Sequence, residues 1–108
     1  MTRNELSKAI SDGKSALVLR YLWKKTEGVH FNELCRKLEG KVSRNTLFER
    51  LAWMEDTGIV ESEMRRLDLA EFDSAVRVRR WIKHYGLPTR TRAAVESLWR
   101  LSARAKGR

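Results

Sequence analysis

The segment from Lys14 to Thr26 carries apolar side chains on nearly every side of a helix. On a helical wheel, one broad apolar arc holds Leu17, Val18, Tyr21 and Leu22, and the other side holds Ala16, Leu19 and Trp23. Such a helix must be covered by other elements on more than one side. Because the chain has 108 residues, these elements can form one small domain around one modest core, and a second catalytic domain does not fit.

The composition favours a mostly helical domain. Apolar residues make up 42% of the chain, which is too much for a disordered tail, and 6 Gly with 1 Pro are too few for a turn-rich β-sandwich. The longest uninterrupted apolar run, Ala16 to Leu19, is too short to cross a membrane, and Met1 to Glu5 lack the apolar core of a signal peptide. We therefore expect a soluble protein without a membrane partner, and the single cysteine, Cys35, favours a reducing cytoplasm.

Apolar spacing predicts further helices on both sides of this segment. They are expected at Asn4 to Ile10, Phe31 to Leu38, Arg44 to Thr57 and residues 88–105, and Ser11, Asp12 and Gly13 offer cap residues between the first two helices. The helix from Arg44 has the clearest limits. Ser43 suits its N-cap, Leu47, Leu51 and Met54 repeat along one side, and Gly58 suits a left-handed C-cap.

Two strands are expected at Ile59 to Arg66 and at Ala75 to Ile82, and Val29 with His30 could form a short third strand. In the second strand apolar residues alternate with Arg77, Arg79 and Trp81, which is typical of a half-buried hairpin arm. The predicted fold is mainly α with a small β-hairpin (α+β), in the order α-α-α-α-β-β-α of a winged helix-turn-helix. Residues 1–108 form one domain, with an N-terminal helix at 1–12, the core at 13–85 and a C-terminal helix at 88–105.

Several short motifs add a resemblance to a family. They are Gly13-Lys14, Leu17 to Leu22, Phe31-Asn32-Glu33-Leu34, Ser43, Thr46-Leu47, Arg50-Leu51, Met54-Glu55 and Gly58-Ile59-Val60. Together they resemble the core of the HxlR/MarR-type transcription regulators of bacteria and archaea, from about Gly13 to Val60. This resemblance implies a dimeric, nucleoid-associated winged-helix protein that binds double-stranded DNA and regulates transcription.

The helix from Arg44 to Thr57 suits the major groove of DNA, which admits one α-helix. Asn45 can pair with adenine and Glu49 can accept from cytosine, so these two residues are candidates for reading bases. Arg44 and Arg50 flank the apolar stripe and suit phosphates, and Thr46 lies beside them. The alternative is that Asn45 and Glu49 belong to an ordinary solvated helix face.

The excess of positive charge lies in the C-terminal third of the chain. From Ala75 to Arg108 there are 10 basic residues and a single acidic one, Glu96, so the last third carries the whole formal net charge of +9. The predicted hairpin carries Arg65 and Arg66 on its first strand and Arg77 and Arg79 on its second. These four arginines could contact the phosphate backbone of a duplex or enter its minor groove. The loop from Leu67 to Ser74 is acidic, which departs from the usual basic wing tip.

Regulators of the resembled group form two-fold dimers, which implies a second copy as partner. The two terminal helices offer apolar residues for this contact: Leu6, Ile10, Val95, Leu98, Trp99 and Leu101. In the alternative arrangement, both helices complete the core of a monomer.

No other chemistry is indicated by the sequence. It shows no Ser/His/Asp set, glycine-rich phosphate loop or paired carboxylate motif, so we expect neither an enzyme nor a cofactor. Cys35 is the only cysteine, and His30 and His84 have no ligand at metal spacing, so we expect no metal. Two further classes stay open: a nonspecific architectural DNA-binding protein and a winged-helix module that binds other proteins.

Overall fold

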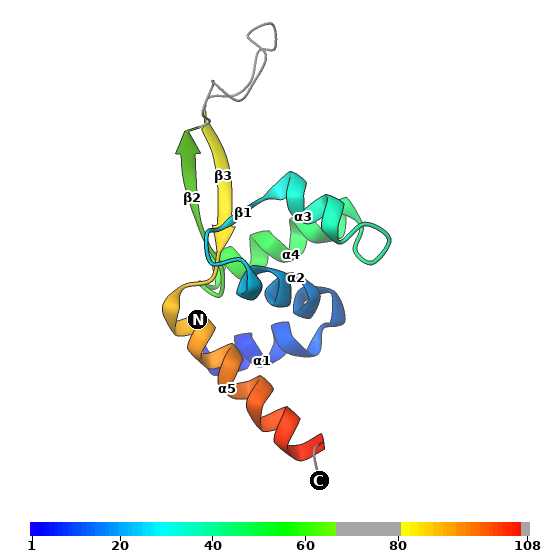
Figure 1. Ribbon diagram of the computed structural model, residues 1–108, viewed down its shortest axis with the longest axis vertical. Coiled ribbons are helices and arrows are strands. Elements are labelled where there is room, and N and C mark those ends of the chain that lie inside the picture. Colours follow the sequence, from blue (N-terminus) through cyan, green and yellow to red (C-terminus); the bar gives the residue numbers. More distant parts are fainter. Residues whose placement is uncertain (67–80, 107–108) are drawn as a thin grey trace, which may run out of the picture.

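The computed structural model describes residues 1–66 and 81–106 (Figure 1). Within these residues the chain is mainly helical with a small three-stranded antiparallel sheet, which confirms the α+β class. The elements are α1 (Arg3–Ser11), α2 (Gly13–Lys24), β1 (Val29–His30), α3 (Phe31–Lys37), α4 (Arg44–Asp56), β2 (Glu61–Arg66), β3 (Trp81–Gly86) and α5 (Thr89–Lys106). The short strand considered at Val29 and His30 is present as β1 between α2 and α3, although the predicted order α-α-α-α-β-β-α did not include it.

The first four helices each begin at a side chain that accepts a hydrogen bond from a backbone N–H in the first turn. These caps are Thr2, Asp12, His30 and Ser43. They satisfy N–H groups that have no partner inside the helix. Two predicted limits of α4 are confirmed: it follows Ser43, and Gly58 beyond its end has a φ of 80° in the left-handed region.

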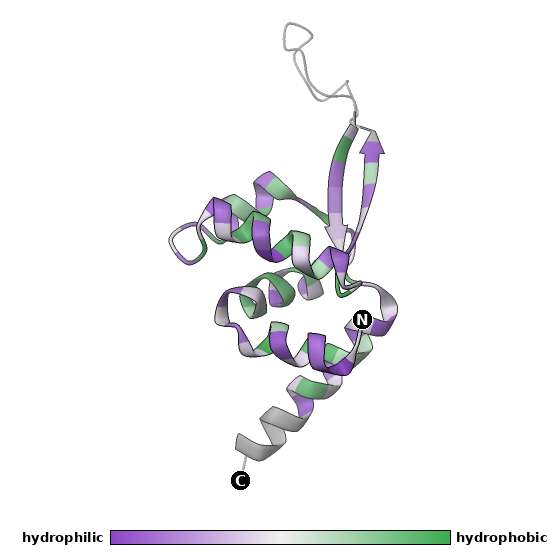
Figure 2. Ribbon diagram, turned by 180° about the vertical axis from the view of Figure 1, so that it is seen from behind, coloured by the Kyte–Doolittle hydropathy of each residue, from purple (hydrophilic) through white to green (hydrophobic). Residues whose placement is uncertain are grey.

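Helix α2 lies between α1 and α4 in the core (Figure 1). Its Val18, Leu19 and Leu22 are fully buried, so the helix is covered on more than one side, as its sequence requires. Leu6 of α1 and Leu47 of α4 belong to the same core. Figure 2 shows both hydrophilic and hydrophobic residues along α1 and α4, which fits helices with one side in the core and one in solvent.

Strand β3 is the central strand of the sheet and pairs antiparallel with β1 and with β2. The second strand was predicted at residues 75–82, but the described strand begins at Trp81 and continues past Ile82 to Gly86. Residues 75–80 lie outside the described residues. The strand extends further because β1 pairs with it at His84 and Tyr85 and so gives this segment a second hydrogen-bonding neighbour.

Helix α5 is anchored near its start and points away from the rest of the domain at its C-terminal end (Figure 1). Thr91 and Val95 are fully buried. The Arg92 guanidinium donates hydrogen bonds to carbonyl oxygens at the end of α2, at 2.7 Å to Trp23 and 3.1 Å to Leu22. Among the described residues, no helix is long and apolar enough to cross a membrane.

Candidate nucleic-acid interface

Helix α4 presents one side to the core and the opposite side to solvent. Leu47, Leu51 and Met54 are at most 1% exposed. The exposed residues form what we call the outer face of α4: Arg44, Asn45, Phe48, Glu49, Ala52 and Asp56. Both predicted base readers and one predicted phosphate contact therefore lie together on an open face.

Phe48, Ala52 and Asp56 lie on this face but were not among the predicted site residues, and Phe48 is the large apolar residue of the three. Its side chain is 63% exposed, although the opposite side of the helix is the apolar one. Its position was readable from the sequence, because it lies three residues after Asn45 and four before Ala52 and so shares their side of a helix.

The Phe48 ring is supported by α3. Its edge-to-face contact with the Phe31 ring has a centroid distance of 6.3 Å and an interplanar angle of 89°. The Arg44 guanidinium lies 5.3 Å from the Phe31 centroid, within the range of a cation–π contact. It also donates a hydrogen bond of 3.4 Å to Asn32 Oδ1. The start of α3 therefore orients both Phe48 and Arg44.

The other two predicted residues of α4 are occupied elsewhere. Thr46 belongs to the helix cap, because its backbone N–H donates to Ser43 Oγ at 3.2 Å and its Oγ1 accepts from the same hydroxyl at 2.9 Å. Arg50 lies on the flank that faces α1 and α2, where its Nε is 2.8 Å from Asp12 Oδ2 in an ion pair. This pair lies beside the outer face, and Arg50 is not part of that face.

The opposite flank of α4 is tied to the hairpin. Lys83 Nζ lies 2.6 Å from Glu55 Oε1, which also accepts a hydrogen bond of 2.8 Å from Ser62 Oγ. The hydrogen bond from Lys83 lowers the pKa of the Glu55 carboxyl, and the same bond raises the pKa of the Lys83 ammonium. Both groups are therefore charged at neutral pH.

A groove of about 410 Å³ lies between α4 and β3. It is lined by Phe48, Ala52, Glu55, Asp56, Lys83 and Tyr85. Within the described part of the chain, neither Glu49 nor Asp56 forms an ion pair. The outer face therefore combines an amide, an aromatic ring and a guanidinium with uncompensated carboxylates, and it is not a uniformly basic surface.

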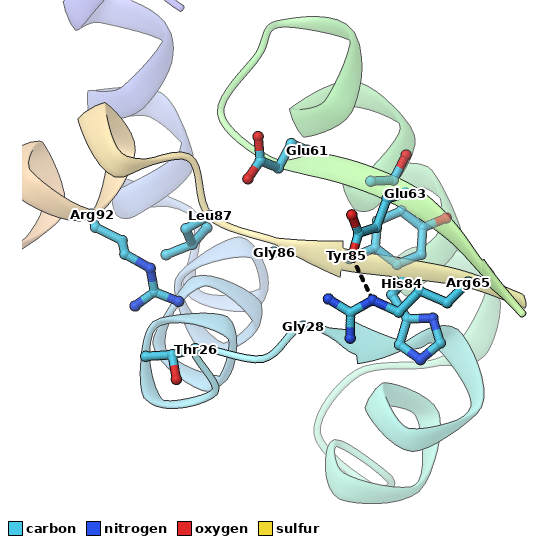
Figure 3. A pocket seen from close by; sticks show the side chains of 11 residues that line it. Thr26, Gly28, Glu61, Glu63, Arg65, His84, Tyr85, Gly86, Leu87 and Arg92 are labelled. Atoms are coloured by element: carbon cyan, nitrogen blue, oxygen red, sulfur yellow. Dashed lines mark hydrogen bonds and ion pairs between the residues drawn. The ribbon is translucent and has the colours of Figure 1, made fainter. Parts of the chain in front are cut away.

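Arg65 lies on the side of the hairpin away from α4. Strand alternation separates it from Ser62, which contacts Glu55. Arg65 pairs with Glu63, and its guanidinium packs so closely over Gly28 that a Cβ there would lie 3.0 Å from Arg65 Nη2. Figure 3 shows this guanidinium in a pocket of about 220 Å³ that is lined by residues of β2 and β3 and by the segment before β1, which contains Thr26 and Gly28. Arg65 is thus separated from the outer face of α4.

The remaining predicted wing residues reach the limit of the described structure. Arg66 is the last residue of β2 and pairs in register with Trp81, which is 54% exposed. Arg77, Arg79 and the acidic loop 67–74 lie outside the described residues.

The six residues predicted for dimerisation do not form one exposed surface. Leu6 and Val95 are at most 3% exposed within this chain, so they belong to its own core, as in the monomer alternative. Ile10, Leu98 and Trp99 are half-buried against that core, and Leu101 lies in α5. The Trp99 ring also meets the Trp23 ring at 5.6 Å.

Other chemistry is sparse in the described part of the chain. No three His, Cys, Asp or Glu residues there lie close enough to hold a metal ion. Cys35 is half-buried, and the His30 ring meets the His84 ring edge-to-face at 5.8 Å. Comparisons with protein-family models, with curated proteins and with solved structures found no match. The HxlR/MarR-type resemblance therefore stays a prediction.

Proposed function

We propose that this chain binds double-stranded DNA as a winged helix-turn-helix protein, with α4 in the major groove. The observation that carries the proposal is the open outer face of α4, on a domain in which α3, α4, β2 and β3 follow in the order expected for this fold. The major groove is about 12 Å wide and accepts one helix of this kind.

Each residue of the outer face has a separate role in this proposal. Asn45 pairs with the N6/N7 edge of adenine, and Glu49 accepts a hydrogen bond from cytosine N4. Arg44, oriented by Phe31, contacts a backbone phosphate. Arg79 and the other basic residues of the C-terminal third supply the sequence-independent attraction.

A regulator of this kind acts as a two-fold dimer on a palindromic site. Two copies of α4 would then lie one helical turn apart, about 34 to 36 Å along the duplex. By occupying such a site the dimer would control transcription.

Selection of bound duplexes from a random pool tests the proposal directly. We expect one preferred sequence, with Asn45→Ala weakening its binding by about 1–3 kcal/mol and relaxing the preference at one base pair. Asn4→Ala is the matched control, because Asn4 is an exposed asparagine on α1, away from the outer face. Equal loss in both variants would contradict base reading by Asn45.

Salt tests the electrostatic part. If a dimer neutralises roughly 6 to 10 phosphates, its affinity falls steeply between low and physiological salt, and Arg79→Ala weakens all duplexes alike. An affinity that stays flat with salt would contradict this part of the proposal.

A module that binds another protein is the second candidate, and the groove between α4 and β3 favours it. Phe48 and Asp56 line that groove, and a carboxylate there repels phosphates. Micromolar or weaker binding to every duplex at 150 mM salt would support this candidate. An architectural DNA-binding protein would instead bind tightly without selecting a sequence.

A further inference from the structure

The described residues place an apolar contact in the middle of the polar outer face of α4. Phe48 is 63% exposed, and Ala52 lies one helical turn further along the same side. The support of the Phe48 ring by Phe31 means that it has an orientation before any partner arrives. An oriented ring loses little conformational entropy when it binds.

Asn45 precedes Phe48 by three residues, which is about 4.5 Å along the helix axis. This rise is close to the step of about 3.4 Å between neighbouring base pairs. A helix that puts Asn45 on an adenine therefore brings Phe48 close to the next base pair. At that depth in the major groove, the 5-methyl group of thymine is the apolar group that the bases present, and phenylalanine and alanine side chains contact it.

We infer that Phe48, assisted by Ala52, is a specificity-determining residue that packs against the methyl group of a thymine beside the adenine bound by Asn45. This inference rests on the proposed function and adds the base class that α4 selects. The preferred half-site then contains an adenine and a thymine at neighbouring base pairs.

Replacement of thymine by deoxyuridine tests the inference, because deoxyuridine keeps the pairing edge and lacks only the 5-methyl group. Each thymine of the selected duplex is replaced singly, and the affinity of the full chain is measured at fixed salt. We expect one or two positions at which the wild-type chain binds about fourfold more weakly, the fold-change of one buried methyl group. At those positions Phe48→Ala should lose most of this difference between the two duplexes, because Ala52 alone makes only a small contact with the methyl group.

Two further variants test the role of Phe48. Asn45→Ala, the control on the same face, should keep the difference between thymine and deoxyuridine, and Phe48→Leu should keep part of it. If the wild-type chain binds the duplex but is indifferent to deoxyuridine everywhere, or if Phe48→Ala keeps the full wild-type difference, the inference is overturned while DNA binding stands. If no duplex binds at 150 mM salt, the proposed function fails and the inference fails with it. Binding of an apolar peptide to Phe48 would then assign this face to a protein partner.

Discussion

At the scale of single residues, Asp12 both caps its own helix and forms an ion pair with a distant helix. Asp12 caps α2 by accepting from the Ser15 N–H at 3.3 Å and from the Ser15 hydroxyl at 2.7 Å, and it also pairs with Arg50 of α4. The Ser15 hydroxyl, followed by the smaller effect of Arg50, lowers the pKa of the Asp12 carboxyl. The cap and the ion pair can be separated by substitution.

Substitutions of Asp12 should rank by what they remove. Asparagine caps helices about as well as aspartate, so Asp12→Asn should lose only the ion pair, about 0.5 kcal/mol at this partly exposed site. Asp12→Ala also removes the cap and should lose about 1–2 kcal/mol. Urea unfolding measures both losses, provided that the slope of the unfolding free energy against urea concentration is the same in the wild-type chain and the variants. Equal losses would mean that the cap contributes nothing.

Glu55 should make stability depend on pH in the acid range. Its pKa is lowered in the folded chain, so its contribution is present above the ordinary value of 4.5 and is lost as pH falls. Glu55→Gln should therefore be less stable by about 0.5–1 kcal/mol at pH 7, and the difference should shrink progressively as pH falls below 4.5.

Thermal unfolding at several pH values measures this difference between Glu55→Gln and the wild-type chain. Glu39→Gln is the control, because Glu39 is exposed and has no ion-pair partner within residues 1–66 and 81–106. A difference for Glu55→Gln that stays constant with pH would show that charge is not its cause.

At the scale of elements, local signals predicted helices well and sheet pairing poorly. The limits of α4 were readable because Ser43, the leucine repeat and Gly58 are local to it. The end of β3 was not readable, because it depends on β1, which lies far away in the sequence. Phe48 was missed for another reason. Apolar residues are expected in the core, whereas this aromatic ring lies on the outer face of α4.

The same contrast applies to the candidate site. Asn45, Glu49 and Arg44 were found on the open face because wheel positions follow from the sequence of one helix. Arg50 and Arg65 were placed by partners that no local pattern reveals, Asp12 in one case and Glu63 in the other.

Arg92 should dominate the attachment of α5 to α2. Its guanidinium donates to Trp23, Leu22 and, at 3.3 Å, Lys25 carbonyl oxygens, where the helix dipole also favours a positive charge. Arg92→Met should therefore lower the free energy of unfolding by about 2 kcal/mol. Chemical denaturation measures this change in the free energy of unfolding, and Arg100→Met is the control.

Arg100 is the matched residue because it is an exposed arginine of the same helix and pairs only with Glu96 in the described part of the chain. Its substitution should cost less than about 0.5 kcal/mol. Comparable losses at Arg92 and Arg100 would show that the carbonyl contacts do not hold α5 in place.

At the scale of the whole molecule, the burial of Leu6 and Val95 limits which residues can form a dimer interface, because these two side chains already pack inside their own chain. A dimer formed without unfolding either core would use the half-buried Ile10, Leu98 and Trp99 and the part of α5 that points away from the domain. Such a dimer would place the basic C-terminal thirds of both copies near each other. Its dissociation constant should therefore depend on the salt concentration.

Light scattering coupled to gel filtration measures the oligomeric state. We expect a mass of about twice 12.7 kDa at micromolar concentration. Leu98→Lys should shift it to the monomer, while Ser97→Lys, at the exposed neighbouring position, should not. Circular dichroism of both variants checks that the helices persist. A wild-type species of 12.7 kDa would exclude the dimer.

The ion pairs on the two flanks of α4 have a mechanical consequence. Asp12 holds one flank through Arg50, and Lys83 holds the other through Glu55, so the helix cannot roll about its own axis without breaking one of them. If α4 binds DNA as we propose, its fixed orientation presents the side chains of the outer face in one direction. A duplex that does not match this direction must twist or bend, so we expect flexible pyrimidine–purine steps to be tolerated better than stiff tracts.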